Sequence, residues 1–128
     1  MGHVIHSPFR IPISEKKVFA LNLNVYRNTN HWDLNKAKKA YKELMCEPIL
    51  KLPIFNKITL TLVMYPKTRA KFDVGNVGSV VEKFFLDALT EFGKLEDDNY
   101  VFCPTVTYTF GEVDKNNPRV EIHINAKV

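Results

Sequence analysis

The most constraining feature of this sequence is an apolar stripe with helical spacing in its second half. The stripe recurs at the three- and four-residue intervals that place side chains on one face of an α-helix. Asn76 is a good N-cap and Gly93 favours the end of a helix, so we expect a helix between these two residues. A helix with one apolar face must pack against another element. The stripe consists of Val77, Val80, Val81, Phe84, Ala88, Leu89 and Phe92.

The segment before this helix has the pattern of a strand. Residues 57–65 alternate apolar side chains with threonine and are rich in β-branched residues, and Pro66 ends the run. A polar segment over residues 111–118 is typical of a turn, and we expect it to join the last two strands as a hairpin. Further strands are expected over residues 3–13, 18–26, 100–110 and 119–126.

A first helix is expected over residues 34–46, with Asp33 as its N-cap and Pro48 as the residue that prevents its continuation. The order of elements predicts an α+β fold, a small mixed β-sheet with two main helices packed on one face. A chain of 128 residues with no linker or repeat predicts a single domain over residues 1–128. No stretch is long and apolar enough for a membrane span, and we expect a cytoplasmic protein.

The charge of the chain admits an anionic partner. Lys plus Arg number 18 and Asp plus Glu number 14, which gives 18 − 14 = +4. Lys67, Arg69 and Lys71 occupy every second position of a segment without apolar periodicity, and the segment runs into Asp73. This pattern is typical of a loop or strand end that contacts phosphates.

Carboxylates bracket the second helix, with Asp73 before it, Asp87 in its last half and Asp97–Asp98 after it. Asn76, Lys83 and Asp87 fall on one face of that helix, because about 100° separates successive residues. Oxygen ligands of this kind suit Mg²⁺ or Mn²⁺. The alternative is that Lys83 and Asp87 form a surface ion pair and that residues 97–99 are a turn. The sequence leaves open whether the carboxylates converge.

Three segments in this order resemble the central signature of the RusA family of Holliday-junction resolvases. They are residues 71–76 (KFDVGN), 83–89 (KFFLDAL) and 95–99 (LEDDN). The usual signature is Asp-x-Asp-Asn, a helix with Lys-x-x-x-Asp-Ala-Leu, and then an Asp-Asp pair. The resemblance extends from about residue 20 to the C-terminus. It also includes an Asn-x-Tyr segment at residues 23–28, a basic helix at residues 36–42, and a closing strand at residues 117–122 that is similar to that of phage-borne members.

The resemblance implies a homodimer that binds four-way DNA junctions and cuts them by Mg²⁺-dependent phosphodiester hydrolysis, with Mn²⁺ as a possible substitute. For a phage-borne protein, the site of action would be the cytoplasm of the bacterial host. By position, Asp73 and Asp98 match metal-binding carboxylates, and Lys83 matches the lysine near the scissile phosphate. Asp87 and Asn76 match residues that frame the site, where Asp87 would join the metal ligands and Asn76 the DNA contacts.

The sequence departs from the usual signature at two places. Gly75 stands where the second Asp is expected, and the segment from Asn76 to Lys83 is longer by about one helical turn. The loss of a carboxylate lowers metal affinity unless Asp87, Asp97 or water replaces it. On the resemblance as a whole, the leading hypothesis is a junction-selective endodeoxyribonuclease. A junction-binding protein impaired in cleavage and an interaction module that does not bind nucleic acid are the alternatives.

Overall fold

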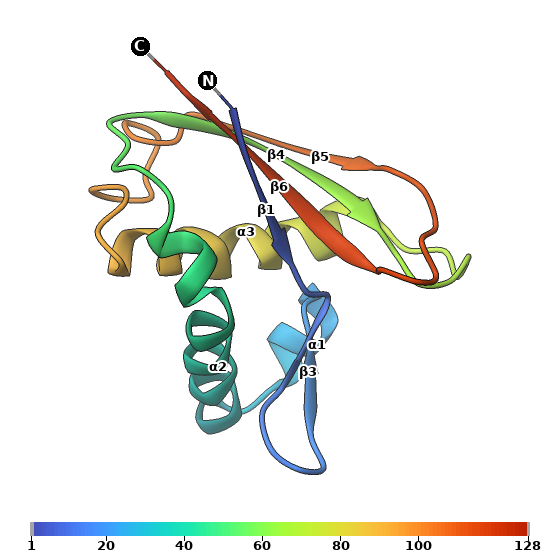
Figure 1. The fold of residues 1–128 in the computed structure, drawn as a ribbon. Helices are drawn as coiled ribbons and strands as arrows, with labels where there is room; N and C mark the ends of the chain where they lie inside the picture. The colour runs from blue at the N-terminus through green and yellow to red at the C-terminus, as the bar shows by residue number, and fades with distance from the viewer. Residues whose placement is uncertain (1, 128) are drawn as a thin grey trace.

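The computed structural model describes residues 2–127 and arranges four strands in one mixed sheet, with helices on one of its faces (Figure 1). This confirms the predicted α+β class. A second, two-stranded sheet was not predicted. In chain order the elements are β1 (Gly2–Ser7), β2 (Arg10–Pro12), β3 (Val18–Ala20), α1 (Leu23–Asn28), α2 (His31–Leu50), β4 (Ile58–Tyr65), α3 (Val74–Glu91), β5 (Thr105–Phe110) and β6 (Arg119–Ala126).

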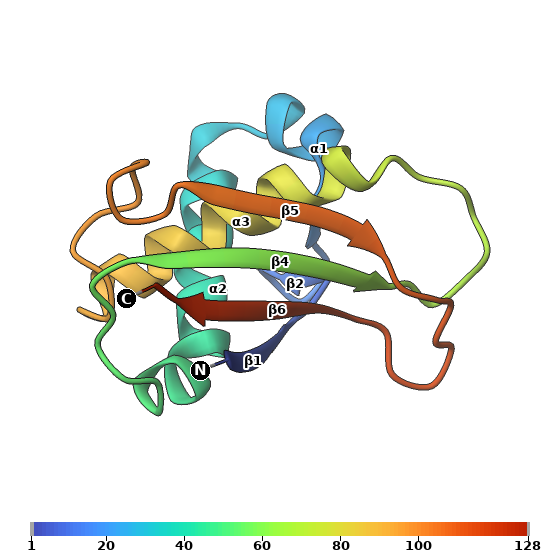
Figure 2. The same cartoon turned by 90° about the horizontal axis from the view of Figure 1, so that it is seen from above.

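Strand β4 is central, and the predicted hairpin of the last two strands is wrong. The strand order is β1-β6-β4-β5, so β4 separates β5 from β6 (Figure 2). Strand β5 pairs with β4 in parallel and β6 pairs with it antiparallel. The segment over residues 111–118 crosses the end of β4, where the Gly111 N–H donates to the Met64 carbonyl at 2.8 Å and the Asp114 N–H donates to the Pro66 carbonyl at 2.8 Å.

Helix α3 packs its apolar stripe against the inner face of this sheet. Most of the predicted stripe is buried, and Gly93 ends the helix with φ of 74°, as expected for a left-handed cap. The predicted N-cap is wrong, because the cap is Asp73, whose side chain accepts from the Gly75 N–H at 3.0 Å. Asn76 lies inside the first turn of the helix.

Phe84 of α3 connects the helices to the small sheet. Its ring is stacked on Phe19 of β3 at 5.6 Å and meets Tyr41 of α2 edge-on at 5.5 Å, both measured between ring centroids. It also meets Tyr26 of α1 at 6.5 Å. The buried Tyr41 hydroxyl donates to the Ser7 hydroxyl at 2.8 Å, which links α2 to β1. A single aromatic cluster therefore joins β3, α1 and α2 to α3.

The strands expected over residues 3–13 and 18–26 differ from the observed elements. The first is split at Pro8 into β1 and β2, which belong to different sheets. The second ends at Ala20 and continues as α1. Asn22 explains this change, because its side chain accepts from the Val25 N–H at 2.9 Å and so caps a helix where the alternating pattern predicts a strand.

Helix α2 is longer at both ends than the predicted helix over residues 34–46. Its N-cap is Asn30 rather than Asp33, since the Asn30 side chain accepts from the Asp33 N–H at 2.9 Å. Pro48 lies within the last turn, where its missing N–H costs one helical hydrogen bond. The neighbouring Met45 and Ile49 are buried in the core, which favours continuation of the helix. Over residues 2–127, none of the helices combines the length and hydropathy needed to cross a bilayer.

Two glycines of α3 provide a matched test of its packing on the sheet. A Cβ added at Gly78 would lie 2.6 Å from the Tyr108 ring of β5 and 3.0 Å from Met64, whereas one at Gly75 would meet only the Asp73 carboxylate, at 3.5 Å. We expect Gly78→Ala to lower the free energy of unfolding by about 1–3 kcal/mol through overpacking. Gly75→Ala should leave it unchanged or raise it by up to about 1 kcal/mol, because alanine favours the helix. Urea unfolding followed by circular dichroism measures both, and equal effects would contradict the packing described.

Candidate nucleic-acid interface

The predicted phosphate contacts lie on a loop that projects from one end of the sheet. Residues 66–73 connect β4 to α3 at this end (Figure 2). Lys67, Arg69 and Lys71 are all exposed. Within residues 2–127 none of the three forms an ion pair. The structure thus presents these cations to solvent, where they are available to an anionic ligand.

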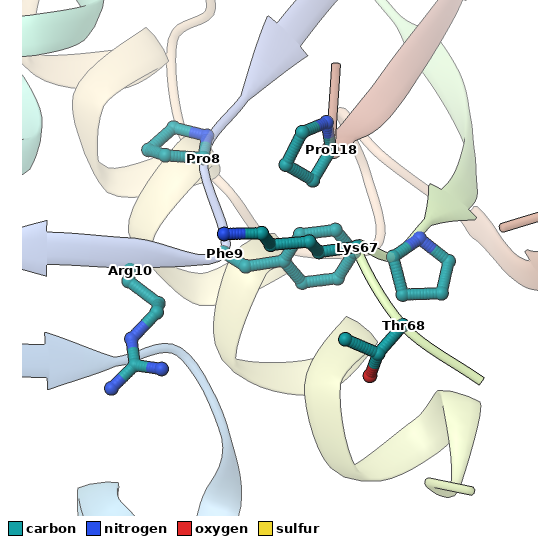
Figure 3. A pocket seen from close by; sticks show the side chains of 7 residues that line it. Pro8, Phe9, Arg10, Lys67, Thr68 and Pro118 are labelled. Carbon is teal, nitrogen blue, oxygen red and sulfur yellow. The ribbon is translucent and has the colours of Figure 1, made fainter. Parts of the chain in front are cut away.

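The loop borders a group of cavities that we together call the loop groove. It comprises three adjoining cavities of about 420, 440 and 360 Å³, which share Thr68. Most of its wall is formed by residues 8–10, residues 66–72 and the segment from Phe110 to Pro118. In one cavity, Pro8, Phe9, Arg10, Lys67, Thr68 and Pro118 surround the opening (Figure 3). The groove lies where β1, β4 and β5 end.

Sequence reasoning found the three cations of residues 67–71 but not the other residues that line this groove. Arg10, Phe9 and Phe110 are far from the cationic loop along the chain and come beside it only through the strand order. No spacing in the sequence links them to residues 67–71. The groove therefore became visible only in the folded chain.

Arg119 lies at the same end of the sheet, but its charge is already paired with carboxylates. Its guanidinium contacts the Asp114 carboxylate at 2.8 Å and the Glu121 carboxylate at 2.7 Å. It also lies 4.1 Å from the centroid of the Tyr65 ring. These contacts hold the segment over residues 111–118 against the sheet. They also neutralise Asp114, the carboxylate whose backbone is bonded to Pro66.

Asp73 lies where the loop groove meets α3. Its carboxylate is exposed and caps the helix through the Gly75 N–H. Lys71 and Phe72, the two residues before it, line the groove. Asp73 thus directly follows two residues of the groove wall.

Asn76 and Lys83 both lie beside α1, the segment that resembles the family's Asn-x-Tyr motif. The half-buried Asn76 side chain accepts from the Leu23 N–H at 3.2 Å, so its oxygen holds α1 on α3. Lys83 is exposed, and its Nζ lies 5.9 Å from the centroid of the Tyr26 ring. Asn76 thus has a structural contact in addition to its predicted DNA contact.

Asp87, Asp97 and Asp98 lie at the opposite end of α3. The Asp97 carboxylate accepts from the Asp98 N–H at 2.7 Å and from the Asn99 side chain at 3.2 Å, so residues 97–99 form a local turn. Burial, the neighbouring Asp97 and the charge of Asp87 raise the pKa of the Asp98 carboxyl above its ordinary value. The alternative ion pair between Lys83 and Asp87 is absent from the described residues.

The structure does not bring the predicted metal ligands together within one chain. At 1.5 Å per residue, the helix separates Asp73 from Asp87 by about 21 Å. Asp98 lies near Asp87, whose charge contributes to the raised pKa of the Asp98 carboxyl. Ligands of one Mg²⁺ must each place an oxygen about 2 Å from the ion. In the described part of the chain, no three His, Cys, Asp or Glu side chains are placed to hold a metal ion. One copy alone does not fit the predicted metal site.

The candidate interface of a single copy therefore consists of an exposed cationic loop, a groove beside it and one carboxylate at their junction with α3. The remaining predicted carboxylates belong to a separate region at the far end of the helix. The chain matches no protein-family model and none of the curated proteins with which it was compared.

Proposed function

We propose that this protein binds branched DNA, with four-way junctions as the substrate class. The observation that carries the proposal is the set of exposed cations at Lys67, Arg69 and Lys71, none of them engaged by a carboxylate of the described chain. Cations that replace counterions along the phosphate backbone supply most of the affinity of such proteins.

The position of the loop in the fold supports this proposal. It follows β4, which is parallel to β5, and the two strands end at the same edge of the sheet. Ligands of α/β units gather at the carboxyl ends of parallel strands, beside the start of the connecting helix. The choice of a branched substrate depends on the resemblance to RusA resolvases and on a homodimer, whose two-fold symmetry suits a junction.

Mg²⁺-dependent cleavage, with Mn²⁺ as a substitute, is the second candidate function. It is favoured by the place of Asp73, directly after the cationic loop. Because Asp98 lies at the far end of α3, cleavage requires two copies in which Asp73 of one meets Asp98 of the other. Tyr100 and Val101, which follow Asp98 closely, are 80% and 47% exposed and suit a contact with a second copy.

Divalent metal would polarise the phosphodiester and activate water at such a shared site. The chain's own contributions would be carboxylate oxygens from Asp73 and Asp98, and the charge of Lys83 near the phosphate. Asp87 or Asp97 would have to replace the carboxylate that Gly75 lacks. If none does so, the protein binds junctions without cutting them, and a cleavage assay decides between these two functions.

The first prediction concerns affinity. Replacing Lys67, Arg69 or Lys71 with Gln should weaken junction binding and reduce the slope of log K against log salt by about 0.9 for each phosphate that the variant no longer neutralises. Lys57→Gln is the matched control, because Lys57 is exposed and lies just before β4, at the opposite end of the sheet. Fluorescence anisotropy with a labelled four-way junction over a salt series measures both quantities. A slope that is the same in all four variants would place the DNA contacts elsewhere.

The second prediction concerns assembly of the cleavage site. Asp73→Asn and Asp98→Asn should each abolish Mg²⁺-dependent cleavage while junction binding persists. A mixture of the two variants should regain strand nicking, because in a mixed dimer one shared site combines the remaining Asp73 with the remaining Asp98. The measurement is cleavage of a labelled junction after the two variants are unfolded and refolded together.

Three results of this experiment are informative. Restored nicking supports a site shared between copies. Failure of the mixture to cut, with wild type active and binding intact, would contradict a shared site. A wild-type protein that binds junctions but does not cut them at any Mg²⁺ or Mn²⁺ concentration would leave junction binding as the function.

A further inference from the structure

The loop groove combines features that a surface for phosphates alone does not require. Among the described residues, its wall carries four cations, Arg10, Lys67, Arg69 and Lys71, and no carboxylate. It also carries three aromatic rings. Phosphate contacts need only the cations, so the rings point to a second part of the ligand.

The three rings form a row along the groove. Phe9 meets Phe72 edge-on with 6.5 Å between ring centroids, and Phe72 meets Phe110 at 6.3 Å. Phe9 and Phe72 are half-buried against the core, whereas Phe110 is 50% exposed. Prolines 8, 66 and 118 complete the apolar wall of the first cavity. Phe9 and Phe72 are thus fixed by the core, whereas Phe110 is open to solvent.

We propose that the loop groove binds an unpaired nucleobase of DNA, against Phe9 and Phe72, while Arg10 and Lys67 contact the phosphates on either side of it. Proteins that hold single strands combine a cationic groove with aromatic platforms for the bases. The cavity that both Phe9 and Phe72 line, of about 360 Å³, falls within the size range of small-ligand sites. This inference depends on the proposed function and deepens it, because bases at the centre of a branched junction can leave their stacks.

The groove is also held in shape before a ligand arrives. The Phe9 carbonyl accepts from the Leu21 N–H at 2.8 Å, and the Pro66 carbonyl accepts from the Asp114 N–H at 2.8 Å. Asp114, a carboxylate close to the groove, is paired with Arg119. The wall therefore keeps its positive charge next to the rings, which suits the alternation of base and phosphate along a strand.

The test separates bases from phosphates in the probe. A labelled oligothymidine and a strand of equal length with abasic residues throughout carry the same phosphates, but only the first carries bases. We expect wild type to bind the oligothymidine about fivefold or more tightly, since one stacked base contributes about 1–3 kcal/mol. Equal affinity for the two strands would overturn the inference without any variant being needed.

Two leucine variants assign the preference to the groove. Phe9→Leu and Phe72→Leu keep an apolar side chain against the core but remove the ring, and should reduce the preference for oligothymidine towards unity. Phe92→Leu is the control, because Phe92 is also half-buried but lies at the other end of α3. Thermal unfolding verifies that each variant is folded. A preference that persists in both groove variants would also overturn the inference.

The outcomes also separate this inference from the proposed function. If wild type binds a four-way junction with the expected salt dependence but does not distinguish the two strands, only the nucleobase site fails. If it binds neither the junction nor either strand, the proposed function fails, and the nucleobase site fails with it.

Discussion

The burial of Phe84 is the interaction on which the arrangement of this protein depends. Its ring contacts β3, α1 and α2 at once, and its own helix is fixed to the sheet by the close approach of Gly78 to Tyr108. Aromatic pairs of this geometry add to the free energy gained by burial of the rings. Helix α3 is therefore a rigid rod between two loops. The length of α3, rather than the flexibility of the loops, sets the distance between the cations of residues 67–71 and the carboxylates of residues 97–98.

Elements with a strong local pattern could be predicted from the sequence. The buried stripe of α3 and the alternation of β4 specify their own structure, because the periodicity of side chains matches one conformation. The starts of α1 and α2 depended on single capping contacts of Asn22 and Asn30, where an alternating pattern or a neighbouring Asp suggested another boundary. The pairing of β5 and β6 with β4 could not be predicted in this way, because it depends on contacts between distant parts of the chain.

The residues of the candidate site likewise differ in whether local sequence or distant contacts bring them together. The cations of residues 67–71 are neighbours in sequence, so their exposure together on one loop could be predicted. Arg10 and Phe110 join them only because β1 and β5 end at the same edge of the sheet as β4. For Asp73 and Asp98 the reverse holds, since a motif that is continuous in sequence is separated in space by the helix it contains. The spacing of two ligands along the chain indicates a metal site only where the residues between them turn back and bring the two side chains together.

The place of β6 in the sheet has a consequence for how the chain folds. This strand is the last element in sequence, yet it lies between β1, the first, and β4. Its pairing with β1 joins Gly2 to Asn125, so closure of the sheet must wait for a contact that spans nearly all of the described chain. Such non-local pairing slows folding. During synthesis on the ribosome, β1 and one edge of β4 remain without partners until residues 119–126 emerge, and these open edges are the surfaces most exposed to aggregation.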